Sequence, residues 1–507
     1  MLALVTTGVA APLQSQMAVP QPVRKAAQTI TAEDLHRRLS VIAHDSMMGR
    51  NTPSPGLDMT AQYVADQFKQ FGLKPGGENG TWFQRYPLEQ RVTDVAKSHV
   101  GFMTGGKHVH ADFSRDARVL RGPASPGEIK GEVYLVGGDI AAAKIDAEAA
   151  KDRVVLVVTD YSKGVRNARI QFFRVAGALR KASPKGVVLL SNRDAEAFDR
   201  EVAAQSTPSV SLPAPTGPVS GFPVVEVHDR AAEAILEAAA VNLAAIRSSG
   251  DMVARLVPNL TMGIDIQQRT EPITAPNTIG VLEGTDPVLK NEYVVYSAHM
   301  DHIGVRPGQP DSIANGADDD ASGTVTVVEL AQAFSQSGAR PKRSMIFMTV
   351  SGEEKGLWGS RYFSDHPTVP LEKMVANLNV DMIGRNWTDT VVAIGKEHSD
   401  LGQTLARVNA RHPELTMTAI DDIWPEENFY GRSDHFNFAR KGVPILFFFT
   451  GVHEDYHQVG DEVDKIDTEK TARIGQLLFY LGQEIANAPE RPKWNPESYR
   501  KIVETNE

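Results

Sequence analysis

The sequence predicts an α/β protein with a mostly parallel central sheet flanked by helices and with a smaller inserted α/β domain. In the second half of the chain, short apolar runs of strand type alternate with helical patterns. Such alternation is typical of a parallel sheet covered by helices on both faces. A separate group of apolar runs occurs earlier, and 507 residues exceed one ordinary domain. These observations together predict two domains.

The composition excludes several classes of protein. Hydrophobic residues make up 41% and charged residues 23%, which suits a globular protein with a sizeable core. The net charge of −10 argues against nucleic acid or an anionic membrane as the main partner, because both bind basic surfaces. The chain has no cysteine, which excludes disulfides, thiol nucleophiles and cysteine metal ligands. A transition-metal site would therefore be built from His, Asp and Glu.

Segment 1–25 resembles a secretory signal. It is apolar from Leu2 to Ala11 and has small residues near its end, although a basic n-region is missing. The apolar stretch is shorter than the ~20 residues that span a bilayer, and we expect no stable membrane insertion elsewhere. We therefore expect a periplasmic or secreted protein, the alternative being a disordered tail. Segment 491–507 is interpreted as a C-terminal tail.

The region 26–120 is expected to form the N-terminal part of the catalytic domain. Thr31 is a candidate N-cap for a first helix. A second helix is expected over 57–71, because apolar residues recur there at helical spacing before the terminating Gly72. Asn79 and Gly80 then indicate a turn.

The region 121–251 is expected to be the inserted α/β domain, without a catalytic cluster of its own. A helix is expected around 172–181. Short apolar runs predict four strands, at 132–136, 153–158, 186–190 and 223–227.

The region 252–490 is expected to be the catalytic domain. Its strands are predicted at 293–298, 344–350, 375–380, 391–394 and 444–449. Its helices are predicted at 322–335, 400–411 and 468–486.

Polar clusters follow the ends of these strands. Ligands of open α/β sheets bind beyond the carboxyl ends of the strands, so these clusters are candidates for one shared site. Each cluster alone has a structural explanation, such as a helix N-cap or a surface turn. Five of them at one edge favour a site: 299–302, 318–320, 351–354, Asp381 and 453–457.

The residue types in these clusters suit two divalent metals that share a bridging carboxylate. Two imidazoles with three or more carboxylates form such a site, and paired metals can activate one water. Adjacent carboxylates in extended chain point to opposite sides, so one of Glu353 and Glu354 could bind metal while the other accepts a proton. Asp301 lies two residues after His299 and could orient it.

These segments resemble, in order, the motifs of the co-catalytic dizinc aminopeptidases, a family that includes aminopeptidase Y, bacterial leucyl aminopeptidases and glutamate carboxypeptidases. The resemblance covers about 257–488 and rests on HMDHIG, NGADDDASG, SGEEKGLWGS, NVDMIG, GRSDHFNF and DYHQVGD. The insert resembles a protease-associated domain on VVLVV, FRVAGALRKA and GVVLLS. Met48-Gly49-Arg50 and FGLKP resemble the N-terminal helices of bacterial members.

The resemblance implies two divalent metal ions, for which we expect Zn²⁺, and five ligands. These are His299 and Asp381 for one metal, Glu354 and His457 for the other, and Asp319 between them. His302, Asp318, Asp320, His435 and His453 have no ligand role in this interpretation.

The resemblance also implies roles around the metals. Glu353 would be the general base, Asp301 would orient His299, and Tyr456 would polarise the scissile carbonyl. Arg432 resembles a substrate-side arginine of some members. Some secreted members brace the substrate pocket with a disulfide, which a chain without cysteine lacks, so specificity does not carry over.

The sequence therefore predicts a metal-dependent aminopeptidase that hydrolyses N-terminal residues from peptides. The nearest alternative is a carboxypeptidase of the glutamate carboxypeptidase type, which would need a basic pocket for a substrate carboxylate. A glutaminyl cyclase would use one metal, and a receptor-like binding protein would have lost ligands. Both fit less well, because all five ligand positions are present. The sequence does not predict whether the protein is a monomer or a dimer.

Overall fold

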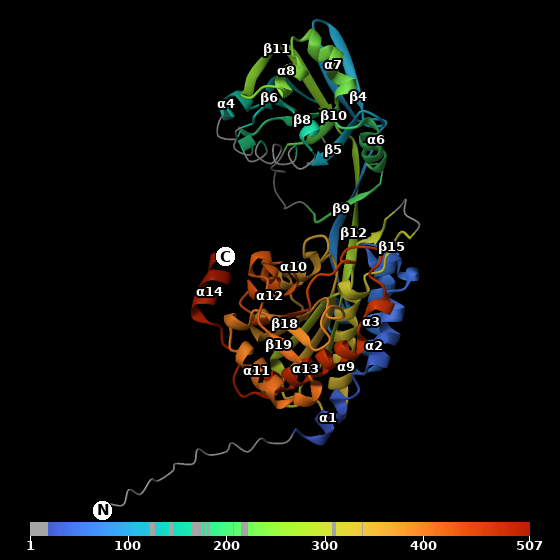
Figure 1. Cartoon of the computed structure of the whole chain (residues 1–507), viewed down its shortest axis with the longest axis vertical. Helices are drawn as coiled ribbons and strands as arrows, with labels where there is room; N and C mark the ends of the chain where they lie inside the picture. The colour runs from blue at the N-terminus through green and yellow to red at the C-terminus, as the bar shows by residue number, and fades with distance from the viewer. Residues whose placement is uncertain are drawn as a thin grey trace, which may run out of the picture. The chain divides into compact units, whose positions relative to one another are not determined.

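The chain divides into two units, drawn in Figure 1 and described here one at a time. Unit 1 comprises Met1–Tyr86 and Thr274–Glu507, and unit 2 comprises Pro87–Ile273. The computed structural model describes residues 19–121, 127–140, 145–164, 168, 175, 178–179, 182–205, 207–213, 222–306, 311–336 and 338–506.

Unit 1 is built on a mixed sheet whose centre is parallel. Its strands run in the order β19-β18-β20-β17-β13-β16-β12-β2. Neighbours β20-β17-β13-β16 are all parallel, whereas β12 pairs antiparallel with β16 and β18 pairs antiparallel with β20. The strands are β2 (Phe83–Thr93), β12 (Gln268–Leu282), β13 (Tyr293–His299), β16 (Ser344–Val350), β17 (Met374–Val380), β18 (Thr390–Ile394), β19 (Thr418–Ile420) and β20 (Ile445–Phe449); β1 (Lys74–Pro75) pairs with β12, and β14 (Gly304–Val305) pairs with β15 (Ile313–Ala314).

The central strands are buried on both faces, as expected of parallel strands that lie between two layers of helices. Successive side chains of a strand alternate between the two faces. Val294 and Tyr296 accordingly pack into one apolar cluster, and Val295 packs into the other. This double burial holds the carboxyl ends of the central strands in fixed positions.

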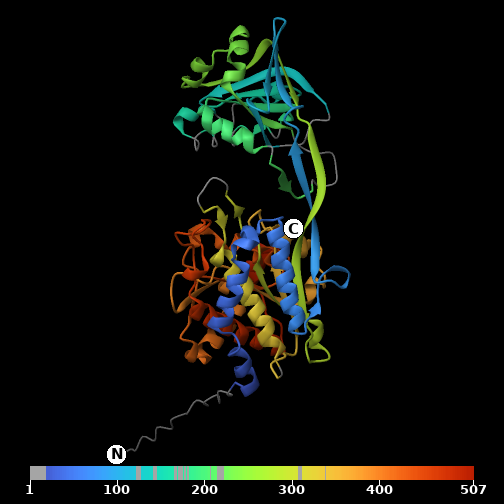
Figure 2. The same cartoon turned by 90° about the vertical axis from the view of Figure 1, so that its right-hand side faces the viewer.

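Helices cover this sheet. Figure 2 shows the N-terminal helices α2 and α3 beside α9, which packs against each of them. Thr31 caps α2, since its side chain accepts the Asp34 amide hydrogen at 3.1 Å. The helices of unit 1 are α1 (Gln21–Ala27), α2 (Ala32–Ile42), α3 (Pro55–Gln70), α9 (Gly323–Ser335), α10 (Trp358–Asp365), α11 (Leu401–Arg411), α12 (His435–Ala439), α13 (Thr468–Asn487) and α14 (Pro496–Ile502).

Unit 2 has a sheet of its own, in the order β4-β3-β11-β6-β7-β8-β10-β5, of which β6-β7-β8-β10 are parallel. Its strands are β3 (His99–Thr104), β4 (Lys107–Asp112), β5 (Ala117–Arg121), β6 (Ile129–Gly138), β7 (Val154–Val158), β8 (Gly186–Ser191), β10 (Val224–His228) and β11 (Met252–Asp265); the short β9 (Ser209–Ser211) pairs with β2. Its helices are α4 (Ala147–Ala150), α6 (Ala195–Ala204), α7 (Asp229–Ala238) and α8 (Leu243–Arg247).

The observed elements agree closely with the predicted α/β pattern. The five strands and three helices predicted for the catalytic domain are all present, each shifted by at most one residue at either end. Unit 2 is wider than the predicted insert 121–251, because β3, β4 and β11 join the sheet that contains β6. The helix predicted at 172–181 lies mostly outside the described residues.

Two further predictions concern the chain ends and membranes. Residues 1–18 of the predicted signal lie outside the described residues, so export stays a prediction. Every helix within the described ranges is too short or too polar to cross a bilayer.

Candidate metal centre

The polar clusters identified in the sequence meet at the carboxyl edge of the central strands. His299 is the last residue of β13, Asp381 directly follows β17, and Glu353 and Glu354 follow β16. The segment 317–322, which precedes α9, is a short irregular helix. Gly316, the residue before this helix, has φ 56°. A Cβ at Gly316 would lie 2.2 Å from the Asp319 carbonyl oxygen, so the turn requires glycine.

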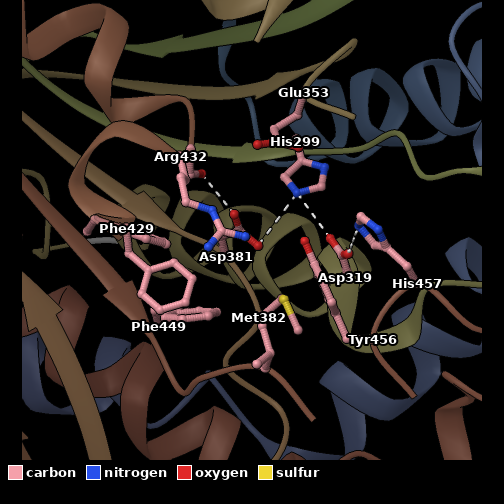
Figure 3. A pocket seen from close by; sticks show the side chains of 13 residues that line it. His299, Asp319, Glu353, Asp381, Met382, Phe429, Arg432, Phe449, Tyr456 and His457 are labelled. Carbon is pink, nitrogen blue, oxygen red and sulfur yellow. Dashed lines mark hydrogen bonds and ion pairs between the residues drawn. The ribbon is translucent and has the colours of Figure 1, made fainter. Parts of the chain in front are cut away.

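Asp319 lies between two histidines. Its Oδ1 is 3.3 Å from His299 Nε2, and its Oδ2 is 3.2 Å from His457 Nε2. Figure 3 shows both imidazoles turned toward this one carboxylate. A carboxylate with each oxygen facing a different imidazole can bridge two cations.

A second carboxylate completes each side of the centre. His299 Nε2 is 3.5 Å from Asp381 Oδ1, and His457 Nε2 is 3.1 Å from Glu354 Oε2. The five residues expected to hold metal are thus brought together, although they come from five segments of the chain.

The donor set fits divalent metal. Asp319 Oδ2, Asp381 Oδ1 and Glu354 Oε1 are buried and accept no well-aligned hydrogen bond, which is costly unless a cation compensates. The surrounding carboxylates raise the pKa of His457 to about 9 against the opposing effect of burial, so the cluster favours positive charge. Nitrogen and oxygen donors of this kind suit zinc.

Two residues without an expected ligand role lie within the same cluster. Asp320 groups with His299 and Asp381, and His302 groups with Asp319 and Glu354. Both oxygens of Asp320 accept main-chain amide hydrogens, from residues 299, 323 and 382, which indicates a structural role. His302 Nδ1 is 2.8 Å from Glu354 Oε1, so His302 can orient Glu354.

The other three residues without an expected ligand role, Asp318, His435 and His453, have contacts outside the five ligands. Asp318 Oδ2 lies 3.3 Å from His453 Nε2, and Asp318 Oδ1 accepts the amide hydrogen of Gly384 at 2.6 Å. His435 is buried and donates through Nε2 to the Tyr430 carbonyl oxygen at 2.8 Å. The contacts of Asp318 join separate loops, whereas the His435 bond stays within the segment 430–435.

Asp301 supports the centre through several contacts. His299 Nδ1 donates to the Asp301 carbonyl oxygen at 3.1 Å and lies 3.7 Å from its carboxylate. That carboxylate accepts the hydroxyl of Thr52 at 3.0 Å and the amide hydrogen of Glu353 at 3.3 Å. Asp301 therefore links the His299 imidazole to the segment that carries the glutamates.

Glu353 lines the same pocket and has a perturbed acidity. Burial raises the pKa of the Glu353 carboxyl well above its usual value, the positive charge of His299 opposes this, and Asp434 and Asp381 add to it. A raised pKa makes a carboxylate a stronger base toward a proton donor such as water. Glu353 and Glu354 therefore occupy chemically different positions in spite of being adjacent.

The pocket beyond the ligands is mainly apolar. Figure 3 shows Phe429 and Phe449 beside Arg432, on the far side of Asp381 from His457. Tyr456 stacks on His457, with the two ring centres 3.9 Å apart. Burial raises the pKa of the Tyr456 hydroxyl, so this hydroxyl keeps its proton and can donate a hydrogen bond. The apolar lining consists of Met382, Phe429, Phe447, Phe449 and Val452.

Arg432 lies at the exposed side of this pocket. Its guanidinium stands 4.7 Å from the centre of the Phe429 ring, and its Nη1 is 3.2 Å from Glu427 Oε2. The side chain is 43% exposed. It is the only lysine or arginine among the described residues that line the pocket.

Sequence reasoning missed three residues that support the ligands. Ser433 donates its hydroxyl to Asp381 Oδ2 at 2.8 Å, Asp461 accepts amide hydrogens from the Asp319 segment, and Arg50 binds carbonyl oxygens beneath the centre. All three lie within motifs noted in the sequence, but a motif alone does not show which loop each side chain contacts.

Comparison with known proteins supports the same family. Residues 277–482 match the family model of peptidase family M28. Aminopeptidase YwaD of Bacillus subtilis is 27% identical over 232 residues, which are 43% of this chain and 47% of that protein. A probable zinc metalloprotease of Pyrenophora teres f. teres is 26% identical over 285 residues, 46% of this chain and 58% of the relative. The chain thus spans about half the length of these curated relatives.

Solved structures show the fold. The aminopeptidase from Aneurinibacillus sp. strain AM-1 superposes with a TM-score of 0.54 at 18% identity, over 92% of this chain and 97% of that one. BSAP, a zinc aminopeptidase from Bacillus subtilis, gives a TM-score of 0.50 at 17% identity, over 91% and 96% of the two chains. The predicted α/β fold is therefore confirmed. The M28 family match and the curated relatives confirm the predicted resemblance to the zinc aminopeptidases. The likeness of the insert to a protease-associated domain stays a prediction.

Proposed function

We propose that this M28-like chain is an aminopeptidase that uses two divalent metal ions to hydrolyse N-terminal residues from peptides. The observation that carries the proposal is the position of Asp319, whose two oxygens lie 3.3 and 3.2 Å from the imidazoles of His299 and His457. The relatives named as zinc metalloprotease and aminopeptidase support this function.

In this proposal His299 and Asp381 hold one ion, Glu354 and His457 hold the other, and Asp319 is shared. Zn²⁺ is the expected metal, because histidine and carboxylate ligands with an open position are typical of catalytic zinc. The paired ions would supply a lowered pKa for the attacking water and polarisation of the scissile carbonyl.

Glu353 moves the proton. Its carboxylate accepts a proton from the attacking water and then gives it to the nitrogen of the leaving amine, so the peptide bond breaks without a free proton in solution. The raised pKa of Glu353 supports the first step, since a carboxylate with a raised pKa is a stronger base toward water.

Other side chains would orient the substrate. Tyr456 keeps its proton and can donate a hydrogen bond to the carbonyl oxygen. The acidic cluster attracts a free α-ammonium group. The aromatic and aliphatic lining of the pocket suits an apolar side chain on the N-terminal residue, since its burial there is favourable.

The presence of Arg432 in the pocket lining keeps a carboxypeptidase as the second candidate function. A C-terminal carboxylate would need a cation in the pocket, and Arg432 is the one available among the described lining residues. Arg432 is half-exposed, and Glu427 already neutralises part of its charge. The carboxypeptidase alternative is therefore less well supported than the aminopeptidase.

Unit 2 is proposed to be the protease-associated-like insert of this enzyme. The peptidase match, 277–482, lies wholly within unit 1, and the parallel strands β6-β7-β8-β10 form a separate α/β body. Peptides are the proposed substrates, and the signal-like segment 1–25 supports export to the periplasm or medium.

A substrate panel tests the proposal. Aminoacyl-nitroanilides, N-acetylated peptides and peptides with a C-terminal acidic residue are assayed before and after chelation. We expect chelator-sensitive cleavage of the free-amino substrates alone, with the highest kcat/KM for apolar N-terminal residues. Cleavage of the blocked acidic peptides would establish the carboxypeptidase instead. No cleavage by metal-replete protein would reject both.

Metal content tests the ligand assignment. We expect the parent to bind two Zn²⁺ per chain and Asp381→Asn to bind about one. Asp319→Asn should bind fewer than one, because only Asp319 is a ligand of both ions. Asp389→Asn, at an exposed position, is the control and should keep two. Equal loss of metal in Asp381→Asn and Asp319→Asn would contradict the bridging role.

A further inference from the structure

Arg50 is a fully buried arginine whose bonding is unusual. All hydrogen bonds of its side chain within the described part of the chain go to main-chain carbonyl oxygens. Nε donates to Met300 at 2.9 Å, Nη1 to Ile42 at 2.9 Å and Asn315 at 2.6 Å, and Nη2 to Gly316 at 2.9 Å. A buried guanidinium that satisfies carbonyl groups of separate loops acts as a cross-link between them.

Two of the linked segments carry proposed metal ligands. Met300 lies in the His299 loop (299–302), and Asn315 and Gly316 begin the Asp319 segment (315–320). The amide hydrogen of His302 returns a bond to the Arg50 carbonyl oxygen at 3.4 Å. One side chain therefore holds the loop of His299 and the segment of Asp319 at a fixed separation.

The backbone around Arg50 is shaped for this position. Met48, Gly49 and Arg50 have φ values of 49°, 63° and 50°, in the left-handed region that only glycine adopts readily. A Cβ on Gly49 would lie 2.5 Å from the Ala314 carbonyl oxygen and 2.8 Å from Gly304 Cα. Strained residues that persist at such a contact are typical of functional sites.

The next residues reinforce the contact. Thr52 is buried, donates its hydroxyl to Asp301 Oδ2 at 3.0 Å, and accepts the amide hydrogen of Gly352 at 3.0 Å. Gly352 precedes Glu353. The segment 50–52 thus touches three of the loops that form the centre, although it lies outside the matched region 277–482.

The charge of Arg50 suits its surroundings. Burial lowers the pKa of its guanidinium, while the carboxylates of Asp461, Asp301, Asp319 and Asp320 oppose that shift. A cation beneath so many carboxylates reduces their mutual repulsion and helps to keep them together.

We propose that Arg50 is a positioning residue of the metal centre: its contacts with the carbonyl oxygens of residues 300, 315 and 316 hold His299 and Asp319 at the spacing that zinc binding requires. The inference rests on the ligands assigned under the proposed function. It makes the N-terminal segment part of the metal site, with no contact of its own to metal or substrate.

Zinc affinity of matched variants tests this inference. The full-length apo-protein is titrated with Zn²⁺ in competition with a chelator, and its thermal midpoint without metal is measured alongside. Arg50→Met removes the donors and the charge at similar length. Arg50→Lys keeps the charge but has a single nitrogen for four carbonyl oxygens. Leu39→Ala, at a buried apolar position of α2, is the control, because it should weaken the same N-terminal helices without removing a hydrogen bond to the ligand loops.

We expect Arg50→Met to weaken zinc binding by about 10–100-fold, the usual cost of losing a group that orients ligands. Arg50→Lys should fall between it and the parent, and Leu39→Ala should bind zinc as the parent does. Parent-like zinc affinity in either Arg50 variant would overturn the inference. Failure of both Arg50→Met and Arg50→Lys to fold would also overturn the inference, because Arg50 would then be required for folding in general. Peptidase activity of the zinc-loaded parent reports separately on the proposed function.

Discussion

The carboxylate of Asp461 accepts the main-chain N–H of Asp319 at 3.0 Å, across 142 residues of sequence. It also accepts the amide hydrogen of Asp318 at 3.0 and 3.1 Å with its two oxygens. Asp461 lies four residues after His457. The loop that supplies His457 is therefore fastened to the segment that supplies Asp319, so the two ligands are positioned together.

Asp461→Asn should destabilise the apo-protein and weaken zinc binding. An amide group offers one acceptor oxygen where the carboxylate offers two, and its NH₂ would face a main-chain N–H. The expected cost is about 1–3 kcal/mol, the range for leaving a buried polar group unsatisfied. Urea unfolding of the apo-protein measures it. Asp464→Asn, an exposed neighbour, should change neither property.

Glu353→Gln should lower kcat by about 10²–10⁴-fold, because the glutamine amide cannot accept the proton from water. Both zinc ions should remain, since Glu353 is a ligand of neither. Hydrolysis of leucyl-nitroanilide and zinc analysis on the same sample give the two values. Loss of zinc together with activity would show that the roles of Glu353 and Glu354 are assigned the wrong way round.

Arg432→Met should distinguish the two peptidase functions. An aminoacyl-nitroanilide has no carboxylate, so its kcat/KM should stay within about threefold of the parent value, as for a substitution at an exposed site. The carboxypeptidase alternative requires a loss of about 10–100-fold on peptides with a C-terminal acidic residue, the worth of a hydrogen bond to a charged group. Arg407→Met, at an exposed position of α11, is the control.

His435 should make the apo-protein less stable in mild acid. Burial lowers the pKa of His435 to about 3, against an ordinary value of 6.5. Between these values the unfolded chain binds a proton that the folded chain does not, so stability falls as pH decreases through 6.5. The sign follows from linkage, and the loss between pH 7.5 and 5.5 is about 1.4 kcal/mol.

Replacement of His435 by glutamine should remove that share of the pH dependence. The amide can still donate to the Tyr430 carbonyl oxygen, so the fold is expected to persist at some cost in stability. Denaturant unfolding of the apo-proteins at both pH values gives the comparison, and His366→Gln, an exposed histidine, is the control. An unchanged difference between the two pH values in His435→Gln would contradict the prediction.

Some parts of the molecule could be predicted because their determinants are local. The strand over 293–298 is a mostly apolar run, and α2 begins directly after Thr31 because the capping side chain and its amide partner are three residues apart. Such signals need no knowledge of distant residues. The long strands β11 and β12 were not predicted, because their exposed portions lack a regular apolar pattern.

The metal centre likewise has features that local sequence predicts and features that depend on distant contacts. The sequence by itself determined the α/β class, the residue types of the centre and the strand ends at which they lie, because an apolar run and the polar cluster after it are read along one stretch of chain. Only the tertiary structure decided that Asp320 faces main-chain amides, that His302 approaches Glu354, and that Arg50 and Asp461 hold the ligand loops. These contacts join residues far apart in sequence, and they exist only once the buried sheet has brought the loops to one edge.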